Sequence, residues 1–499
     1  MNLGTVISNE ETPSTHEFHF VLNPGELVST GQLVKIKTNA GEIVAIVKKI
    51  MRRNRYYEFA ESISQYAKEE KSFDASFPAK DWEYTTATCS ILGVYTPTTG
   101  HLNRCSFPPS PGDGVEETDA ETTGKVLGIS SNGLHLGSLL SAPLECRVDL
   151  SRLLQKHLAV LGMSGSGKSH LMSVIIEELL NRDASKGRLA VIVLDPHGDY
   201  AGFLNPANSF ASSTSVVNCE KVQLATTHLS TFLLSELVPS ISAPAKREYA
   251  KLFAKVKNTC ESEGRPLTLD ELISSSEGGK DRTNLVDILC EVKDLNLFGV
   301  FDSPGLNIIK PGKLIVFDLS GVSLKVKQVI VSFYARKLFH MRQKGSVPPF
   351  TLIVEEAHLF AREKAQRENS ISKPIIETIA REGRKFGACL CLVSQRPVQL
   401  STTALSQCNS FIVMRVTNPY DLQHIGESCE GIDKATLDSI TTLRTGEGII
   451  IGEATNFPTF IKVRQRSFKT AGAPKLEELA KEFENRFVEL KPNDVDAFL

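Results

Sequence analysis

The chain has 499 residues, of which 41% are hydrophobic and 23% are charged, and its formal net charge is −2. These values are typical of a folded protein with several domains and exclude a mainly disordered chain. They also exclude a uniformly basic protein that coats nucleic acid with its whole surface, so any binding of DNA or RNA must come from local basic loops.

The ten cysteines are scattered between Cys89 and Cys429 without a C-x-x-C pair. Cys389 and Cys391 lie two apart in an apolar run, which indicates reduced thiols in a buried strand and neither a zinc site nor a disulfide framework. Residues 1–9 lack a basic segment followed by an apolar one, and no apolar run approaches the roughly 18 residues that span a bilayer. We therefore expect a cytoplasmic protein with no transmembrane segment.

Residues 1–95 carry short β-rich runs separated by turn residues such as Asn23-Pro24-Gly25. Short strands at this spacing predict a small β-barrel, with a sandwich or an irregular sheet as the alternatives. The runs are residues 4–7, 17–22, 33–37 and 42–47.

Residues 96–125 are rich in proline, glycine and acidic residues. This composition indicates a linker or crossover between two domains.

From residue 126 the apolar runs no longer alternate with polar residues, which is typical of strands buried on both faces of a mostly parallel sheet. Helical patterns at residues 169–181 and 325–344 separate some of these runs, so we predict an α/β core of RecA-like type over 126–206 and 306–470. The strand pattern fades over 207–305, where amphipathic segments at 245–257 and 284–296 predict a mainly helical insertion. Residues 471–499 are expected to form a helical C-terminal extension. The non-alternating runs are 158–161, 189–194, 314–317, 352–354, 390–393, 411–414 and 448–451.

The strongest motif follows the run at 158–161 and fits the pattern G-x-x-x-x-G-K-[ST] in full. Its glycines allow backbone N–H groups to converge on a phosphate, and the following helix adds the positive end of its dipole. Lys168 would neutralise the β- and γ-phosphates of ATP, and the Ser169 hydroxyl would ligate Mg²⁺. The residues expected to hold the nucleotide are Gly162, Ser164, Gly165, Ser166, Gly167, Lys168, Ser169 and His170.

Two adjacent carboxylates, Glu355 and Glu356, end another buried run. We expect Glu355 to hold Mg²⁺ through water and Glu356 to polarise the attacking water. Glu355 stands where aspartate is usual, so its reach is one methylene longer. The alternative is a surface acidic pair at the start of a helix.

Further polar residues end the neighbouring runs. We assign γ-phosphate sensing to Gln395, against the alternative of a strand-end hydrogen bond without a catalytic role. Asp195 to Tyr200 close another strand near the site, and His197 taken alone is more typical of a turn residue than of a catalyst. The cluster from Arg381 to Lys385 is either a solvated helix end or the source of an arginine finger that reaches a neighbouring subunit's ATP site.

The order of these motifs resembles the HerA ATPases of the HerA/FtsK branch over almost the whole chain. The glycine-rich loop is generic, whereas the strings Glu382 to Gly387 and Ser394 to Pro397 are more specific. The other strings that carry the resemblance are Lys156 to Gly162, Asp195 to Tyr200 and Glu355 to His358.

The resemblance implies an N-terminal barrel, a RecA-like core with a helical insertion, and a homo-hexameric ring that translocates on double-stranded DNA at the expense of ATP. It implies a partner of the NurA nuclease type in DNA-end resection and repair, or a nuclease or sirtuin-type effector in phage defence. By the same resemblance Arg384 would be the finger acting in trans, with Arg381 as the alternative. Lys156 stands where relatives often carry arginine near the nucleotide, so positive charge is kept but a bidentate contact is lost.

Two other functions stay open at this point. The chain is either a DNA translocase or helicase, or a scaffold or regulatory ATPase whose hydrolysis switches a bound effector. A protein- or plasmid-transfer motor is a third possibility that no membrane segment supports. The loop from Arg362 to Arg367 has mixed charge, which favours a solvated helix face over a pore lining.

Overall fold

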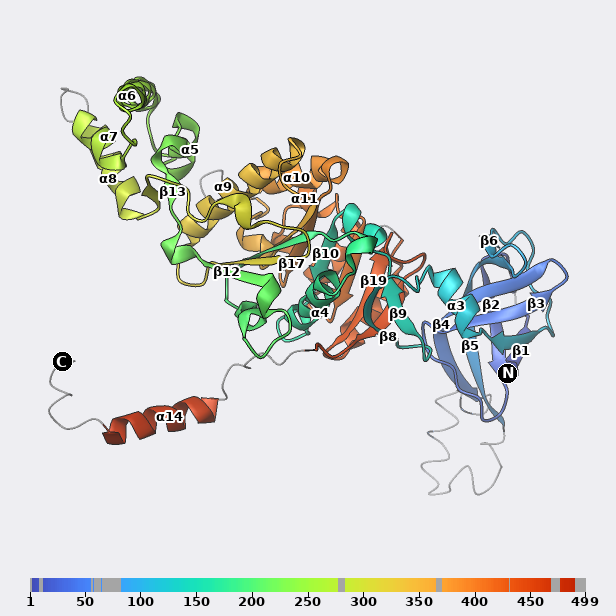
Figure 1. Cartoon of the computed structure of the whole chain (residues 1–499). Coiled ribbons are helices and arrows are strands. Elements are labelled where there is room, and N and C mark those ends of the chain that lie inside the picture. The colour runs from blue at the N-terminus through green and yellow to red at the C-terminus, as the bar shows by residue number, and fades with distance from the viewer. Residues whose placement is uncertain are drawn as a thin grey trace.

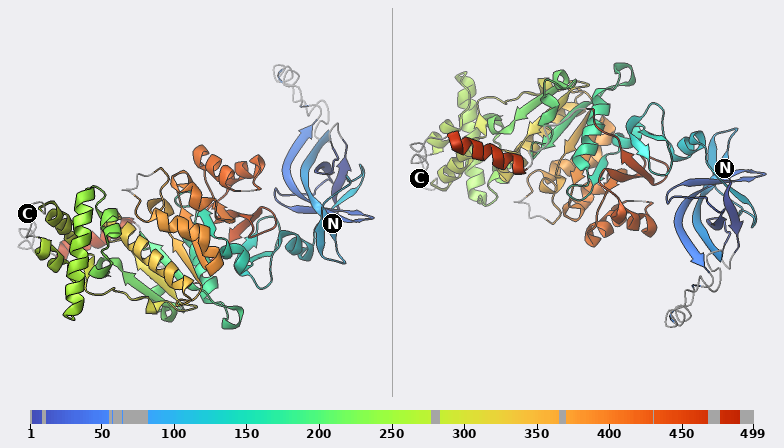
Figure 2. Two further views of the ribbon diagram at one scale, coloured as in Figure 1. Left: turned by 90° about the horizontal axis from the view of Figure 1, so that it is seen from above. Right: turned by 90° about the horizontal axis from the view of Figure 1, so that it is seen from below.

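The computed structural model describes residues 2–8, 12–54, 57, 64, 82–276, 283–364, 370–429, 431–467 and 476–489. A β-barrel lies at one end of the molecule, a helical insertion lies at the other, and an α/β core lies between them (Figures 1 and 2). Within the described residues, no helix combines the length and apolar character that a membrane span requires.

The N-terminal sheet is a barrel, as predicted, because its strand β2 pairs with β5 and thereby closes the sheet order β2-β1-β7-β3-β4-β5. Strands β6 and β7 lie within residues 96–125, for which the sequence indicated a linker. Strand β7 pairs with both β1 and β3, so this stretch completes the barrel as well as leading to the core. The strands are β1 (Asn2–Ile7), β2 (Glu17–Leu22), β3 (Leu33–Thr38), β4 (Gly41–Asn54), β5 (Glu83–Thr96), β6 (His101–Asn103) and β7 (Gly114–Glu117).

The core sheet has the order β12-β15-β11-β16-β17-β10-β18-β19-β20-β8-β9 in the described chain. It is parallel from β12 to β18 and antiparallel from β18 to β9, which confirms the predicted α/β class. The strands are β8 (Leu134–Leu139), β9 (Glu145–Val148), β10 (Leu158–Leu161), β11 (Ala190–Asp195), β12 (Thr214–Asn218), β15 (Leu314–Asp318), β16 (Phe350–Val354), β17 (Ala388–Ser394), β18 (Ser410–Met414), β19 (Glu447–Gly452) and β20 (Thr459–Val463).

Helices cover both faces of this sheet, which explains why its central strands are continuously apolar. Leu158 and Val160 of β10 pack in one cluster with α4, whereas Ala159 and Leu161 face the opposite cluster with α9 and α10. Helix α9 begins after Ser323, whose hydroxyl accepts a hydrogen bond from the backbone N of Val326. The helices outside the insertion are α3 (Ala120–Leu127), α4 (Lys168–Leu180), α9 (Leu324–Gln343), α10 (Lys373–Phe386), α11 (Thr402–Leu405), α12 (Pro419–Ser428), α13 (Lys434–Thr442) and α14 (Leu476–Glu489).

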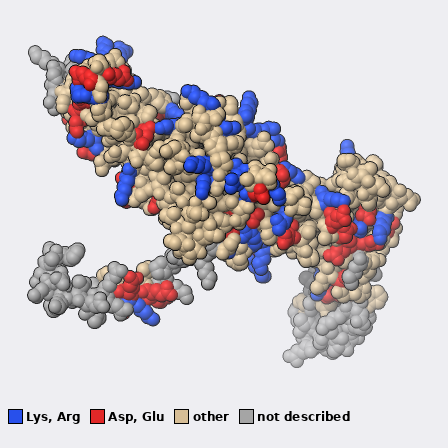
Figure 3. All heavy atoms as spheres, in the orientation of Figure 1, with Lys and Arg blue, Asp and Glu red and all other residues tan. Residues whose placement is uncertain are grey.

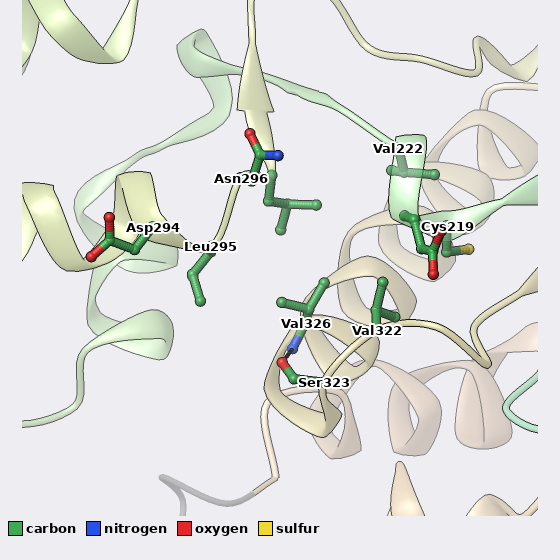
Figure 4. A pocket seen from close by; sticks show the side chains of 10 residues that line it. Cys219, Val222, Asp294, Leu295, Asn296, Val322, Ser323 and Val326 are labelled. Carbon is green, nitrogen blue, oxygen red and sulfur yellow. Dashed lines mark hydrogen bonds between the residues drawn. The ribbon is translucent and has the colours of Figure 1, made fainter. Parts of the chain in front are cut away.

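The helical insertion packs its apolar faces onto the same core cluster as α9. Its elements are α5 (Thr231–Leu237), α6 (Ala243–Ser262), α7 (Leu269–Ser276), α8 (Thr283–Asp294) and the strand pair β13 (Leu224–Ala225) and β14 (Phe298–Gly299). A small pocket marks the junction, with Leu295 and Asn296 on the insertion side and Val322 and Val326 on the core side (Figure 4). Strand β12 also lies within residues 207–305 and joins the edge of the core sheet, so this stretch is not wholly an insertion.

Candidate active site

The glycine-rich loop lies between β10 and α4, where the parallel strands of the core sheet end. Strand β10 is flanked by β17 and β18, so polar residues at the ends of several strands converge beside the loop. Gly167 has a φ of 107°, and a Cβ at this position would lie 3.2 Å from Met414 Cε and 3.3 Å from the backbone N of Gly446. The close approach of the loop to these residues therefore requires glycine.

Lys168 is a buried cation at the start of α4. Its Nζ donates a hydrogen bond to the backbone carbonyl of Met163 at 3.0 Å. Burial lowers the pKa of Lys168, while the negative charges of Glu356, Glu355 and Asp199 oppose that shift. A buried ammonium group beside the positive end of a helix dipole is a strong attractor for a phosphate group.

Glu356 follows β16 and faces Lys168 across the site. Its backbone is left-handed, with a φ of 47°, which is uncommon for a residue with a side chain and typical of functional turns. Burial raises the pKa of Glu356, and the positive charge of Lys168 is the largest opposing effect. Its buried Oε2 has no hydrogen-bond partner in the described structure, although His358 Nδ1 lies 3.2 Å away. An unsatisfied buried carboxylate oxygen is suited to accept a hydrogen bond from a bound molecule.

Glu355 is buried more deeply and is held by Tyr200. The Tyr200 hydroxyl donates a hydrogen bond to Glu355 Oε1. Burial raises the pKa of Glu355 to about 8, partly offset by this hydrogen bond and reinforced by the carboxylates of Asp195, Glu356 and Asp199. Glu355 is therefore largely protonated at neutral pH unless a cation approaches it.

The loop after β11 brings a further carboxylate to the site. Asp195 accepts hydrogen bonds from the backbone N atoms of His197, Gly198 and Tyr200, at 3.2, 2.9 and 3.0 Å. These bonds fold the loop so that Asp199 Oδ2 accepts a hydrogen bond from the Ser169 hydroxyl at 3.3 Å.

The oxygen donors fit Mg²⁺ only in combination with a nucleotide. No group of three or more His, Cys, Asp or Glu side chains in the described ranges is arranged to hold a metal ion. Mg²⁺, however, is commonly bound by one or two protein oxygens together with substrate phosphates. Ser169, Asp199 and Glu355 line one cavity and could supply such oxygens.

These groups line a cavity of about 370 Å³. Most of the predicted site residues meet there, together with Asp195 at the end of β11 and with His197 and Asp199 of the loop that follows. Gly162 and Ser166 do not line it; Ser166 is buried and its hydroxyl donates to the Met163 carbonyl at 2.8 Å. The lining residues are Ser164, Gly165, Gly167, Lys168, Ser169, His170, Asp195, His197, Asp199, Glu355, Glu356 and Gln395.

Arg384 does not belong to this cavity. It lies near the C-terminal end of α10, just before the start of β17. The glycine-rich loop lies beside the other end of β17. Its positive charge lowers the pKa of Glu453, whose main partner is Lys156. Lys156 precedes β10, so Arg384 and Lys156 lie at the edge of the sheet opposite their own glycine-rich loop. Arg381 and Arg384 are both exposed.

Asp199 and Tyr200 are the site residues that the sequence did not single out. The polar string after β11 marked this loop as close to the site. Local spacing, however, could not show that Asp199 would reach Ser169, 30 residues away, or that Tyr200 would reach Glu355, 155 residues away.

The chain is similar to several known proteins. Residues 134–338 match the family model described as "Helicase HerA, central domain". The chain is 28% identical to the DNA double-strand break repair helicase HerA of Sulfolobus acidocaldarius, over 75% of this chain and 77% of the relative. It is 27% identical to the protein of the same name from Pyrococcus furiosus, over 92% and 91%. In fold it resembles VirB4 of Thermoanaerobacter pseudethanolicus, with a TM-score of 0.54 and 15% identity over 68% of this chain and 98% of that one.

Proposed function

We propose that this chain, which is similar to HerA helicases over most of its length, is a P-loop ATPase that works as a homo-hexameric ring and moves along double-stranded DNA, together with a nuclease of the NurA type in DNA-end resection. The observation that carries the proposal is the cavity in which Lys168, Ser169 and Glu356 meet.

Within this cavity each residue has one task in hydrolysis. Lys168 binds the β- and γ-phosphates and stabilises the negative charge that develops on them. Glu356 orients the attacking water and accepts its proton, and Lys168 helps to keep that carboxylate ionised despite its burial. Ser169 and the neighbouring carboxylates would hold Mg²⁺, which would supply further positive charge to the phosphates. Gln395, which lines the same cavity, would sense the γ-phosphate.

The position of Arg384 supports a ring. A guanidinium at the opposite edge of the sheet does not line its own chain's cavity, but it could enter the cavity of an adjacent subunit in a head-to-tail arrangement. We propose Arg384 as that finger, with Arg381 as the alternative.

The charge of the surface would limit contact with DNA to a few places. Basic and acidic side chains are interspersed over the face shown in Figure 3, and the net charge of the chain is −2. DNA binding would therefore depend on a small set of Lys and Arg side chains that contact phosphates without reading the sequence.

The experiment that tests this function compares ATP hydrolysis with and without linear duplex DNA. A translocase should hydrolyse ATP several-fold faster with duplex, whereas a scaffold or regulatory ATPase of an antiphage complex should respond to its effector and not to DNA. An ATPase rate that is indifferent to duplex at low salt would favour the scaffold function.

A further inference from the structure

A second and larger hollow adjoins the ATP cavity. It has a volume of about 870 Å³ and lies between the loop after α5, the start of α9, and the loops that follow β16 and β17. We call it the basic groove, because Lys325, Arg362 and Arg396 line it and no aspartate or glutamate of the described residues does. In a chain with 58 acidic and 56 basic residues, such a lining favours an anionic ligand.

Two arginines give the basic groove its free positive charge. Arg362 and Arg396 are both exposed, and neither forms an ion pair with a carboxylate among the described residues. Lys325, by contrast, is paired with Glu291 at 3.0 Å. A guanidinium group presents a planar set of donors that matches the oxygens of a phosphate group.

The two arginines are carried on loops that are bonded to each other. Arg362 forms a β-bridge with Leu400. The backbone N of Glu363 donates to Gln399 O at 2.8 Å, and that of Ser401 donates to Ala361 O at 2.7 Å. A ligand that contacts one arginine would therefore act on both loops together.

A line of polar contacts runs from this pair of loops to Glu356. The backbone N of Arg396 donates to Ser394 Oγ at 3.0 Å. Ser394 Oγ lies 3.2 Å from His358 Nδ1, and that nitrogen lies 3.2 Å from Glu356 Oε2. His358 Nδ1 is thus close to both the Ser394 hydroxyl and the Glu356 carboxylate, and its contact with Glu356 Oε2 is not a hydrogen bond. Both Ser394 and His358 are buried, and Gln395 lines the ATP cavity as well as the basic groove.

We propose that the basic groove binds the phosphate backbone of duplex DNA through Arg362 and Arg396, and that Ser394 and His358 are positioning residues that link its occupancy to Glu356. This inference rests on the proposed DNA translocase function and deepens it. When Arg396 moves toward a phosphate, its backbone N moves with it and displaces the Ser394 hydroxyl, which accepts a hydrogen bond from that N. The displacement reaches His358 and then the Glu356 carboxylate, which orients the attacking water.

The first arm of the test measures binding of a fluorescent 30-base-pair duplex to the full chain with a non-hydrolysable ATP analogue, over a series of salt concentrations. Each lost phosphate contact should reduce the slope of log K against log salt by roughly 0.9. Arg362→Ala and Arg396→Ala should each reduce the slope in this way, whereas Arg247→Ala, an exposed arginine of α6 outside the groove, should not. Wild-type slopes in both groove variants would overturn the assignment of the groove. Variants that bind duplex normally but no longer bind an acidic protein partner would also overturn it.

The second arm measures the ratio of the ATPase rates with and without duplex. Ser394→Ala should bind duplex within about twofold of wild type and keep its KM for ATP, yet lose most of the stimulation of kcat, and Ser394→Thr should restore part of it by returning the hydroxyl. Full stimulation in Ser394→Ala would overturn the link to Glu356. Since Arg362 and Arg396 are exposed, their variants test the groove even if the buried Ser394 variants fail to fold. Absence of duplex binding by the wild type would instead refute the proposed function, so the two failures are distinguishable.

Discussion

Replacing Glu355 by glutamine should make the unliganded protein more stable at neutral and alkaline pH. Burial raises the pKa of Glu355 to about 8 from an ordinary value of 4.5. Between these values the native state binds more protons than the unfolded state, so stability contributed by this group is present at low pH and is lost as pH rises. Each pKa unit corresponds to about 1.4 kcal/mol, so wild type should lose about 2.5 kcal/mol from this group between pH 5 and pH 7. The neutral amide of Glu355→Gln avoids that loss.

The assay is urea unfolding of wild type and Glu355→Gln without Mg²⁺ or nucleotide, at pH 5, 6, 7 and 8. The difference in unfolding free energy should move in favour of the variant as pH rises. Glu121→Gln, which alters a carboxylate that pairs with Lys125 on the surface, is the matched control and should show no such trend. Adding Mg²⁺ with a non-hydrolysable ATP analogue should flatten the wild-type trend, because a nearby cation favours the ionised carboxylate. Parallel curves for wild type and Glu355→Gln would refute the argument that burial keeps Glu355 protonated.

Three further predictions concern the nucleotide and the ring. Lys168→Ala should weaken ATP binding and abolish hydrolysis because the phosphates lose their buried cation, as measured by nucleotide titration and phosphate release; normal affinity would show that another group binds the phosphates. Glu356→Gln should bind ATP but hydrolyse it about 10² to 10⁴ times more slowly, since an amide cannot accept the proton of the attacking water; wild-type turnover would mean that the base is another residue. Arg384→Ala should keep ATP binding and hydrolyse ATP about 10³ times more slowly. Mixing it with Glu356→Gln chains should restore some activity in rings that contain both variants. A finger in trans would be excluded if demonstrably monomeric wild type were fully active and Arg384→Ala had no effect in the assembled protein.

Much of the core could be predicted from the sequence because its strands are continuous apolar runs and its phosphate loop is one local string. The runs at 158–161 and 390–393 became β10 and β17, and the loop between β10 and α4 has its expected place. Strand β12 was missed because its residues, Thr214 to Asn218, form a short and partly polar edge strand. Strand β7 has only four residues, and its pairing with β1 and β3 depends on contacts far apart in the sequence.

The site shows the same division between local and distant information. Lys168 and Ser169 follow from a motif, and Glu355 and Glu356 follow from a strand end. The contacts of Ser169 with Asp199 and of Glu355 with Tyr200 arise only when β10, β11 and β16 are aligned in the sheet. The roles of Arg384 and Gln395 stay predictions, because a finger acts between subunits and a sensor acts on a bound phosphate.

The central claim is that ATP hydrolysis in the cavity of Lys168 and Glu356 drives movement along duplex DNA. The most direct measurement is displacement of streptavidin from the biotinylated end of a linear duplex, with the wild type and Glu356→Gln compared at equal occupancy by ATP. The wild type should displace streptavidin in proportion to the ATP it hydrolyses, and Glu356→Gln should bind the duplex without displacing it. Wild-type protein that binds duplex and hydrolyses ATP at a normal rate, yet never displaces streptavidin, would contradict the claim.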